Sequence, residues 1–199
     1  MADLEKTGKN LEGRGFRVHR FASGAEAVEF LVQTLHGTSI GIGGSVTIDT
    51  LGVYDRLCES NEVFWHWKNH APETRERAGK AETYLCSANG VSENGEIVNI
   101  DGFGNRVAGT IYGPERVFLV VGRNKIAPDL TGAIDRARNI AAPLNARRLN
   151  RHTPCAVGEP RCHDCRSPEK VCGVMTVFFM PPTSIKEFHV ILVDEDLGY

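Results

Sequence analysis

Apolar and polar positions alternate along this chain in a way that predicts strands and helices following one another. After a turn over 12–15, apolar residues recur first at every second position and then at helical intervals. Ser23 and Glu26 have the spacing of a capping box, which marks the start of the first helix. The first part of the chain is therefore predicted to form a strand, a helix, a strand and a helix, over residues 16–21, 23–37, 39–43 and 46–57.

The rest of the chain continues this order and adds an antiparallel pairing. Asn94-Gly95 is a strong signal for a hairpin between a strand that ends near Val91 and a strand over 96–100. Five apolar residues over 117–121 are typical of a central strand buried on both faces. Further strands are predicted over 62–67, 84–91, 174–179 and 188–193, and helices over 72–82 and 128–149, the second with a kink at Pro143. The alternation favours an α/β layered fold with a mainly parallel sheet and an antiparallel excursion.

Length and composition indicate an ordinary globular protein. The 199 residues, 41% of them hydrophobic and 24% charged, suffice for one domain with one substantial core and argue against disorder. The net charge of −2 produces no overall field that would attract nucleic acid or an anionic membrane. Residues 1–10 do not resemble a secretory signal, and the charge-free stretch over 30–47 is too polar for a membrane span. We expect a cytoplasmic protein.

Four of the six cysteines fall within one short segment. Cys155, Cys162, Cys165 and Cys172 have the spacing C-x6-C-x2-C-x6-C. A reducing compartment disfavours disulfides, and exposed thiols this close together would oxidise or capture metal, so a loop of free thiols is the weaker interpretation. Four thiolates suit either tetrahedral zinc or an iron–sulfur cluster. The sequence therefore predicts a metal-binding loop at 152–173.

The spacing favours a [4Fe-4S] cluster, with zinc as the alternative. Zinc ribbons and knuckles are usually built from two C-x2-C pairs, whereas this segment has one. The loop resembles the iron–sulfur loop of the endonuclease III family of DNA glycosylases, which differs by one residue in the last interval. That resemblance is confined to the loop and implies nothing about DNA repair. Zinc stays open because both groups accept four thiolates.

Basic residues are concentrated around these cysteines. Between Arg136 and Cys172 the chain has eight basic and three acidic residues, a surplus of five positive charges, and the remainder carries −7. Such a density would neutralise an anionic four-thiolate site. It would equally suit an anion-binding surface for a carboxylate, a phosphate or an acidic redox partner, or a solvated helix face.

A glycine-containing turn supplies the first candidate ligand groups. Gly43, Gly44 and Ser45 stand between a predicted strand and a predicted helix, where free N–H groups favour anions. A tight connection capped by Ser45 or Thr47 explains the turn equally well. The dinucleotide-binding fingerprint fails here, because Val46 stands where its third glycine is needed.

Two further groups of polar residues are candidates for the same site. Asp101, Gly102, Asn105 and Arg106 belong to a dense polar turn, which suits either a ligand or hydrogen bonds to its own backbone. The buried strand over 117–121 is followed by polar residues at the end where α/β sheets place ligand groups. These are Asn124 and Lys125, of which Lys125 is the candidate to neutralise an anionic substrate.

Nucleophile and metal candidates outside the cysteine segment are weaker. Cys58 and Cys86 lie in or beside apolar elements and are expected to be small core residues. His66 and His70 are four positions apart, but the neighbouring tryptophans indicate a strand, where that spacing does not make a helical metal pair. No catalytic residue is assigned.

Four stretches, GIGGSVTIDTLG, NGEIVNIDGFGNRVAG, VFLVVGRNKI and HVILVDEDLG, resemble the LUD domain family, the lactate-utilisation proteins. The resemblance covers nearly the whole chain and is greatest to the free-standing C-type members, in the subgroup with a four-cysteine loop. It implies a single three-layer α/β/α domain over 1–199, similar to the ribose-phosphate isomerase and CoA transferase superfamily. The positions that match a proposed ligand cleft of the family are Gly43, Gly44, Ser45, Asp101, Gly102, Asn105, Arg106, Asn124 and Lys125.

Family members are linked to the oxidation of L-lactate to pyruvate alongside iron–sulfur partner proteins. The leading hypothesis is therefore a redox-associated protein that binds a small carboxylate or phosphorylated ligand beside a [4Fe-4S] cluster. As an enzyme it would be an oxidoreductase component of an L-lactate oxidation system. One alternative is acyl or phosphosugar chemistry as in the superfamily, with Asp101 or a nearby glutamate as base or nucleophile. The other is a regulatory or assembly subunit whose zinc or iron–sulfur loop is structural.

Overall fold

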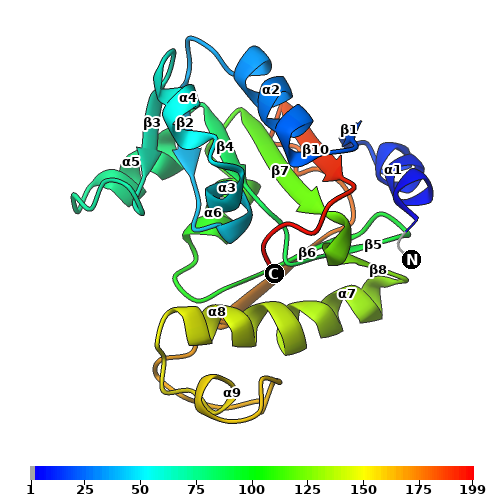
Figure 1. Cartoon of the computed structure of the whole chain (residues 1–199), viewed down its shortest axis with the longest axis vertical. Helices are drawn as coiled ribbons and strands as arrows, with labels where there is room; N and C mark the ends of the chain where they lie inside the picture. The colour runs from blue at the N-terminus through cyan, green and yellow to red at the C-terminus, as the bar shows by residue number, and fades with distance from the viewer. Residues whose placement is uncertain (1–2) are drawn as a thin grey trace.

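The computed structural model describes residues 3–199, and at its centre is a six-stranded sheet with the order β1-β10-β7-β4-β2-β3 (Figure 1). Each neighbouring pair of strands in this sheet is parallel. The predicted α/β fold with a mainly parallel sheet is confirmed. The strands are β1 (Arg17–Phe21), β2 (Ser39–Ile42), β3 (Glu62–Trp65), β4 (Thr83–Cys86), β7 (Arg116–Gly122) and β10 (Glu187–Val193).

Helices on both faces of the sheet complete three α/β/α layers. In β7, Phe118 and Val120 face one apolar core while Leu119 and Val121 face the other, as the period of two in a strand requires. Burying each of these side chains contributes roughly 1.5–3 kcal/mol to folding. The first face is covered by α2 (Gly24–Thr34), α3 (Val46–Leu51) and α4 (Tyr54–Cys58), and the second by α1 (Leu4–Gly13), α5 (Thr74–Lys80) and α6 (Asn105–Ile111).

A second sheet of four strands accounts for the predicted antiparallel excursion. Its order is β8-β5-β6-β9, and the β5–β6 hairpin turns at Gly95, whose φ is 90°. The strand predicted over 84–91 is divided, because residues 87–89 leave the parallel sheet and the chain continues in the second sheet. The strands are β5 (Gly90–Ser92), β6 (Ile97–Asp101), β8 (Ile126–Ala127) and β9 (Val174–Phe178).

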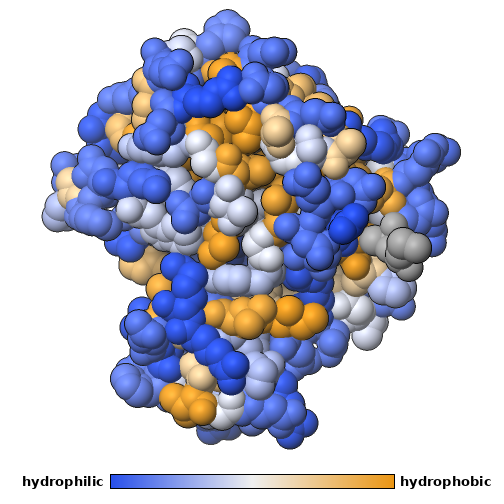
Figure 2. All heavy atoms as spheres, viewed as in Figure 1, coloured by the Kyte–Doolittle hydropathy of each residue, from blue (hydrophilic) through white to orange (hydrophobic). Residues whose placement is uncertain are grey.

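A long helix packs on the outer face of the second sheet. It consists of α7 (Leu130–Arg136), a π-helical turn η2 (Ala137–Ala141) and α8 (Ala142–Arg148). The predicted kink at Pro143 is absorbed by this π-helical turn, in which the Ala142 N–H donates to the carbonyl five residues back. Figure 2 shows an apolar strip along this helix, where Ile140 and Leu144 are 46% and 37% exposed.

Three local predictions were wrong or incomplete. The turn over 12–15 follows a helix, α1, which Asp3 caps by accepting from the Lys6 N–H at 2.8 Å and which the charged sequence concealed. The helix over 46–57 is broken at Gly52, where φ is 64°. The polar turn at 99–106 was not expected to begin helix α6. Within residues 3–199 no helix has the length and apolar character needed to cross a membrane.

Candidate functional site

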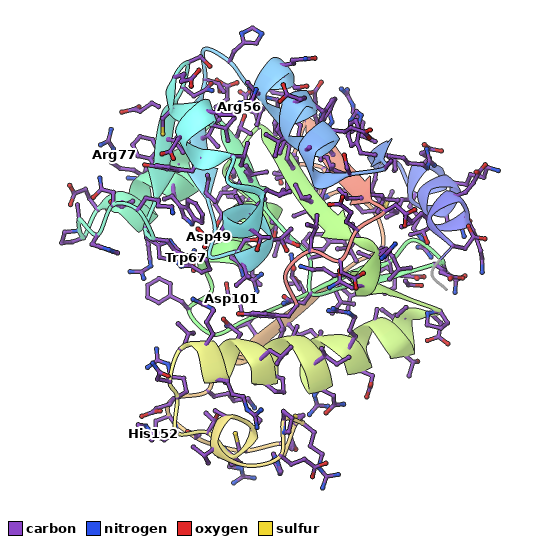
Figure 3. All side chains as sticks on the ribbon, viewed as in Figure 1. Asp49, Arg56, Trp67, Arg77, Asp101 and His152 are labelled. Carbon is purple, nitrogen blue, oxygen red and sulfur yellow. The ribbon has the colours of Figure 1, made fainter. Side chains whose placement is uncertain are left out.

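A cavity of about 700 Å³ lies between the carboxyl edge of the parallel sheet and the long helix. Figure 3 shows Trp67 and Asp101 on the side of the body that faces that helix. Of the nine predicted cleft residues, seven line the cavity: Gly44, Ser45, Asp101, Gly102, Asn105, Arg106 and Lys125. A cavity of this size at this edge of the sheet has the dimensions of a small-molecule site.

The other two predicted residues lie just behind the wall. Gly43 packs on the Arg106 side chain, and a Cβ added to Gly43 would lie 2.8 Å from Arg106 Cγ. Asn124 donates to the Gly198 carbonyl at 3.2 Å and accepts from the Leu197 N–H at 3.1 Å. Both positions therefore shape the site without facing it.

Most of the cations that have no acidic partner within the described residues line the cavity. Fourteen of the 23 lysines and arginines form ion pairs within the described residues. Six of the remaining nine line this cavity: Arg75, Arg106, Lys125, Arg148, Arg151 and Lys170. The two acids in the wall are engaged elsewhere, Asp101 with the Arg106 N–H and Glu169 with the His152 N–H. With six cations and two acids, the cavity wall has a surplus of positive charge.

Lys125 is the most buried of these cations, with 2% exposure at the floor of the cavity. Its position follows from the 3-10 turn η1 (Arg123–Lys125), which directly follows β7. Nζ lies 2.7 Å from Thr47 Oγ1, 2.8 Å from Ser87 Oγ and 3.3 Å from the Ala88 carbonyl oxygen. Burial lowers the pKa of Lys125 well below its usual range, and nearby Arg136 and Arg106 lower it further.

Arg106 is held beside Lys125 by neutral acceptors. Nη2 donates to Asn89 Oδ1 at 3.0 Å and to the Ile100 carbonyl at 2.5 Å. Among the described residues, Nε and Nη1 of Arg106 have no hydrogen-bond partner. Asp101 accepts from the Arg106 N–H at 2.9 Å and so caps α6, which agrees with the predicted alternative of a turn that binds its own backbone.

The glycine-containing turn is a capped connection. Ser45 Oγ accepts from the Ile48 N–H at 3.3 Å, as an N-cap of the six-residue helix α3. Thr47, the other predicted cap, instead donates to the Leu197 carbonyl at 3.2 Å and faces Lys125. Its role in fixing Lys125 was not apparent from the sequence.

Several lining residues were missed or set aside by sequence reasoning. His66 and His70 line the cavity, and burial, helped by Arg75, lowers the pKa of His66 to about 4. The Arg148 guanidinium lies 4.5 Å from the ring centre of Trp67, so it bridges α8 and the body across the cavity. The basic surplus around the cysteines was the available signal for Arg148, Arg151 and Lys170.

The cysteine segment forms one wall of the cavity. Residues 168–171, between Cys165 and Cys172, line it, and they pack so closely on Gly102 that an added Cβ would lie 2.7 Å from Val171 Cα. A second cavity of about 280 Å³ contains Cys162 and Cys172 and shares Ile100 and Lys170 with the first. The segment includes the short helix α9 (Pro154–Val157).

Groups on the long helix hold the cysteine segment in place. Asn139 Oδ1 accepts from the Cys162 N–H at 2.8 Å, and Arg138 Nη2 lies 3.3 Å from Cys162 Sγ and 3.2 Å from Asp164 Oδ1. Both residues belong to the π-helical turn η2, a feature that recurs at functional sites. The basic residues that the sequence concentrates in this region therefore lie in at least two places, around the cavity and against the cysteine segment.

The chemistry of the donor set fits a thiolate-bound group. The four thiols are half-buried and free, and burial raises the pKa of Cys172, with the thiols of Cys162, Cys155 and Cys165 adding to the rise. Four thiolates that repel one another need a cationic group between them. Within residues 3–199, however, no three His, Cys, Asp or Glu side chains are already gathered around a point where a metal ion could bind.

The two remaining cysteines differ in their exposure to solvent. Cys86 is fully buried, as expected of a small core residue, and burial raises its pKa to about 12. Cys58 is exposed at the end of α4, so the expectation that it belongs to the core was wrong.

Fold and site together define an α/β/α protein with a cation-lined cavity at the carboxyl edge of its parallel sheet. The family model of the LUD domain matches residues 4–193, and the chain belongs to this family, which is linked to lactate utilisation. A crystal structure of a DUF162 family protein from Deinococcus radiodurans is similar in fold, with a TM-score of 0.56 and 13% identity over 96% of this chain and 95% of that chain. No curated protein matches the chain.

Proposed function

We propose that this chain binds a small anionic ligand, a carboxylate or a phosphorylated compound, in the cavity, and holds a [4Fe-4S] cluster on Cys155, Cys162, Cys165 and Cys172. Together these would make it a redox-associated component of a lactate-oxidation system with iron–sulfur partner proteins. The observation that carries the proposal is the set of five lysine and arginine side chains that line one cavity together with the buried amine of Lys125, none of them ion-paired within the described residues. Lys125 is buried and Arg106 and Lys170 are half-buried, whereas the other three are exposed. Buried or half-buried charges without partners are costly, and an anion bound near Lys125, Arg106 and Lys170 would remove that cost.

The position of the cysteine segment supports a link between the two parts of the proposal. Residues 168–171 contact Gly102 and line the cavity, so a change in the cysteine segment would reach the ligand directly. A bound cluster would supply one-electron redox chemistry. The protein's own residues would orient the anion through Arg106, exclude water with the wall over 168–171, and hold the cysteine segment through Asn139.

The cluster is tested by anaerobic purification followed by iron, sulfide and zinc analysis. We expect iron and sulfide in equal amounts, retained in Cys58→Ala and lost in Cys165→Ala. Cys58 is a suitable control because its thiol is exposed and lies outside the segment. Zinc alone, at one per chain, would overturn the cluster and favour a structural role for the loop.

The anion site is tested by calorimetric titration with lactate, pyruvate, phosphate and a sugar phosphate. Arg151 and Arg166 form a matched pair, since neither is ion-paired within the described residues and only Arg151 lines the cavity. We expect Arg151→Gln to weaken binding of the preferred anion about fivefold to tenfold and Arg166→Gln to leave it unchanged. Equal effects of the two substitutions, or no binding of any of these anions, would refute an anion site here.

A further inference from the structure

The floor of the cavity has a chemical property that anion binding alone does not require. The hydroxyl of Thr47 donates to the Leu197 carbonyl, and that of Ser87 donates to the Ala88 carbonyl at 3.3 Å. Both hydroxyl oxygens must therefore accept from Lys125 Nζ, at 2.7 and 2.8 Å. These two short bonds need only two of the three hydrogens of an ammonium group.

The third contact of Nζ is longer, and no carboxylate among the described residues accepts from Nζ to favour a third hydrogen. The Ala88 carbonyl oxygen lies 3.3 Å from Nζ and 3.3 Å from Ser87 Oγ, so Nζ and the hydroxyl share a long contact to this acceptor. Lys125 forms no ion pair among the described residues, and the charges that act on it most strongly are the positive ones of Arg136 and Arg106. Loss of one proton from Nζ keeps both short bonds and leaves a lone pair.

A side chain that can bind a carboxylate, Arg106, lies near this amine. Arg106 lines the same cavity, its Nη2 is fixed by Asn89 and Ile100, and its Nε and Nη1 hydrogens have no partner within residues 3–199. A guanidinium with free N–H groups binds a carboxylate strongly. A ligand held there by its carboxylate would lie in the cavity that Lys125 also lines.

The geometry points to Lys125 as a nucleophile that forms an imine with the carbonyl group of a 2-oxo carboxylic acid whose carboxylate lies on Arg106. This inference rests on the proposed anion cavity and narrows its ligand to one class. The Nζ lone pair forms a C–N bond to the carbonyl carbon, and the carbonyl oxygen becomes a hydroxyl group. The C–O bond then breaks and the oxygen leaves as water with the two hydrogens that nitrogen has lost. Amine and ketone give imine and water, without an oxidant or reductant.

The test uses pyruvate as the probe and cyanoborohydride to reduce any imine to a stable secondary amine. Whole protein is incubated with both near neutral pH, and the modified residue is located by peptide mass analysis. An ordinary lysine is neutral in only about one molecule in a thousand near pH 7.4, so Lys125 should be labelled more than about tenfold faster than any surface lysine. Its labelling should also change little with pH, whereas surface labelling rises about tenfold per pH unit below the ordinary lysine pKa.

Two variants and one binding measurement separate the possible results. Lys125→Met should lose the adduct, and Lys186→Met, which removes an exposed lysine paired with Glu115, should keep it. The location of the adduct in the unaltered protein decides the matter even if Lys125→Met does not fold. Calorimetric binding of pyruvate without labelling of Lys125, or labelling spread evenly over surface lysines, would overturn the imine and leave the anion cavity intact. No binding of any anion would overturn both.

Discussion

Replacing Lys125 by methionine should make the protein more stable while removing ligand binding. The substitution keeps a similar volume and takes away three contacts to neutral oxygens, worth roughly 1 kcal/mol each. Against this loss stands the burial of an amine that is 2% exposed and has no acidic partner, a cost of several kcal/mol. Thr47 and Ser87 keep their own bonds to carbonyls, so no donor is orphaned.

The expected net change is an increase of about 1–3 kcal/mol in the free energy of unfolding, or a rise of about 2–10 °C in Tm for a chain of this size. Urea denaturation followed by circular dichroism, on protein without added anion, measures it. Adding the preferred anion at about a hundred times its Kd should stabilise the unaltered protein by about 2.7 kcal/mol and Lys125→Met by far less. A variant destabilised by more than about 2 kcal/mol would mean that Lys125 is a structural tie, and the reasoning from an unpaired buried amine would be refuted.

Three further predictions concern the cavity wall, the cysteine segment and the core. Gly102→Ala should displace residues 168–171, because its Cβ would lie 2.7 Å from Val171 Cα, and it should weaken anion binding more than about tenfold. Gly79→Ala is the control, because no atom lies within 4 Å of the added Cβ, and it should leave the affinity unchanged. Equal affinities of the two variants in calorimetry would contradict a role for the Gly102 contact. Asn139→Ala should lower the iron content of anaerobically purified protein with little change in Tm, since it frees the Cys162 N–H, and an unchanged iron-to-protein ratio would be the contrary result. Burial lowers the pKa of His189 to about 4. Between about pH 6.5 and 4 the unfolded chain therefore takes up a proton that the folded chain does not, and the free energy of unfolding should decrease as the pH is lowered through this window. His189→Phe should reduce that fall, measured by urea midpoints at several pH values; an identical pH dependence in the variant would show that other groups cause it.

The strands of the parallel sheet were predictable because an apolar run, or an alternation of apolar and polar residues, occurs over a short length beside a turn signal. The five consecutive apolar residues over 117–121 are typical of a strand buried on both faces, and β7 contains them all. Helix α1 was not predictable by the same means. Its apolar face is small, with Leu11 buried beside Thr7 and Gly8, so its stability comes from packing rather than from a pattern of large side chains.

A site residue was predictable from the sequence where it directly follows a predicted strand of the parallel sheet. Asn124 and Lys125 follow a buried strand, and the ends of neighbouring parallel strands meet at one edge, so their placement could be derived. The roles of Thr47, Ser87 and Arg148 could not, because they depend on which segments cross the cavity. The near-neutral net charge also concealed the site, since acidic residues elsewhere in the chain offset the six unpaired cations that line the cavity.

X-ray diffraction at the iron absorption edge, on crystals grown anaerobically with pyruvate, tests the central claim most directly. We expect an anomalous peak bounded by the sulfur atoms of Cys155, Cys162, Cys165 and Cys172, together with density for the anion between Arg106 and Lys125. An absent iron peak in crystals that contain all four reduced cysteines, with the cavity filled only by water, would contradict it.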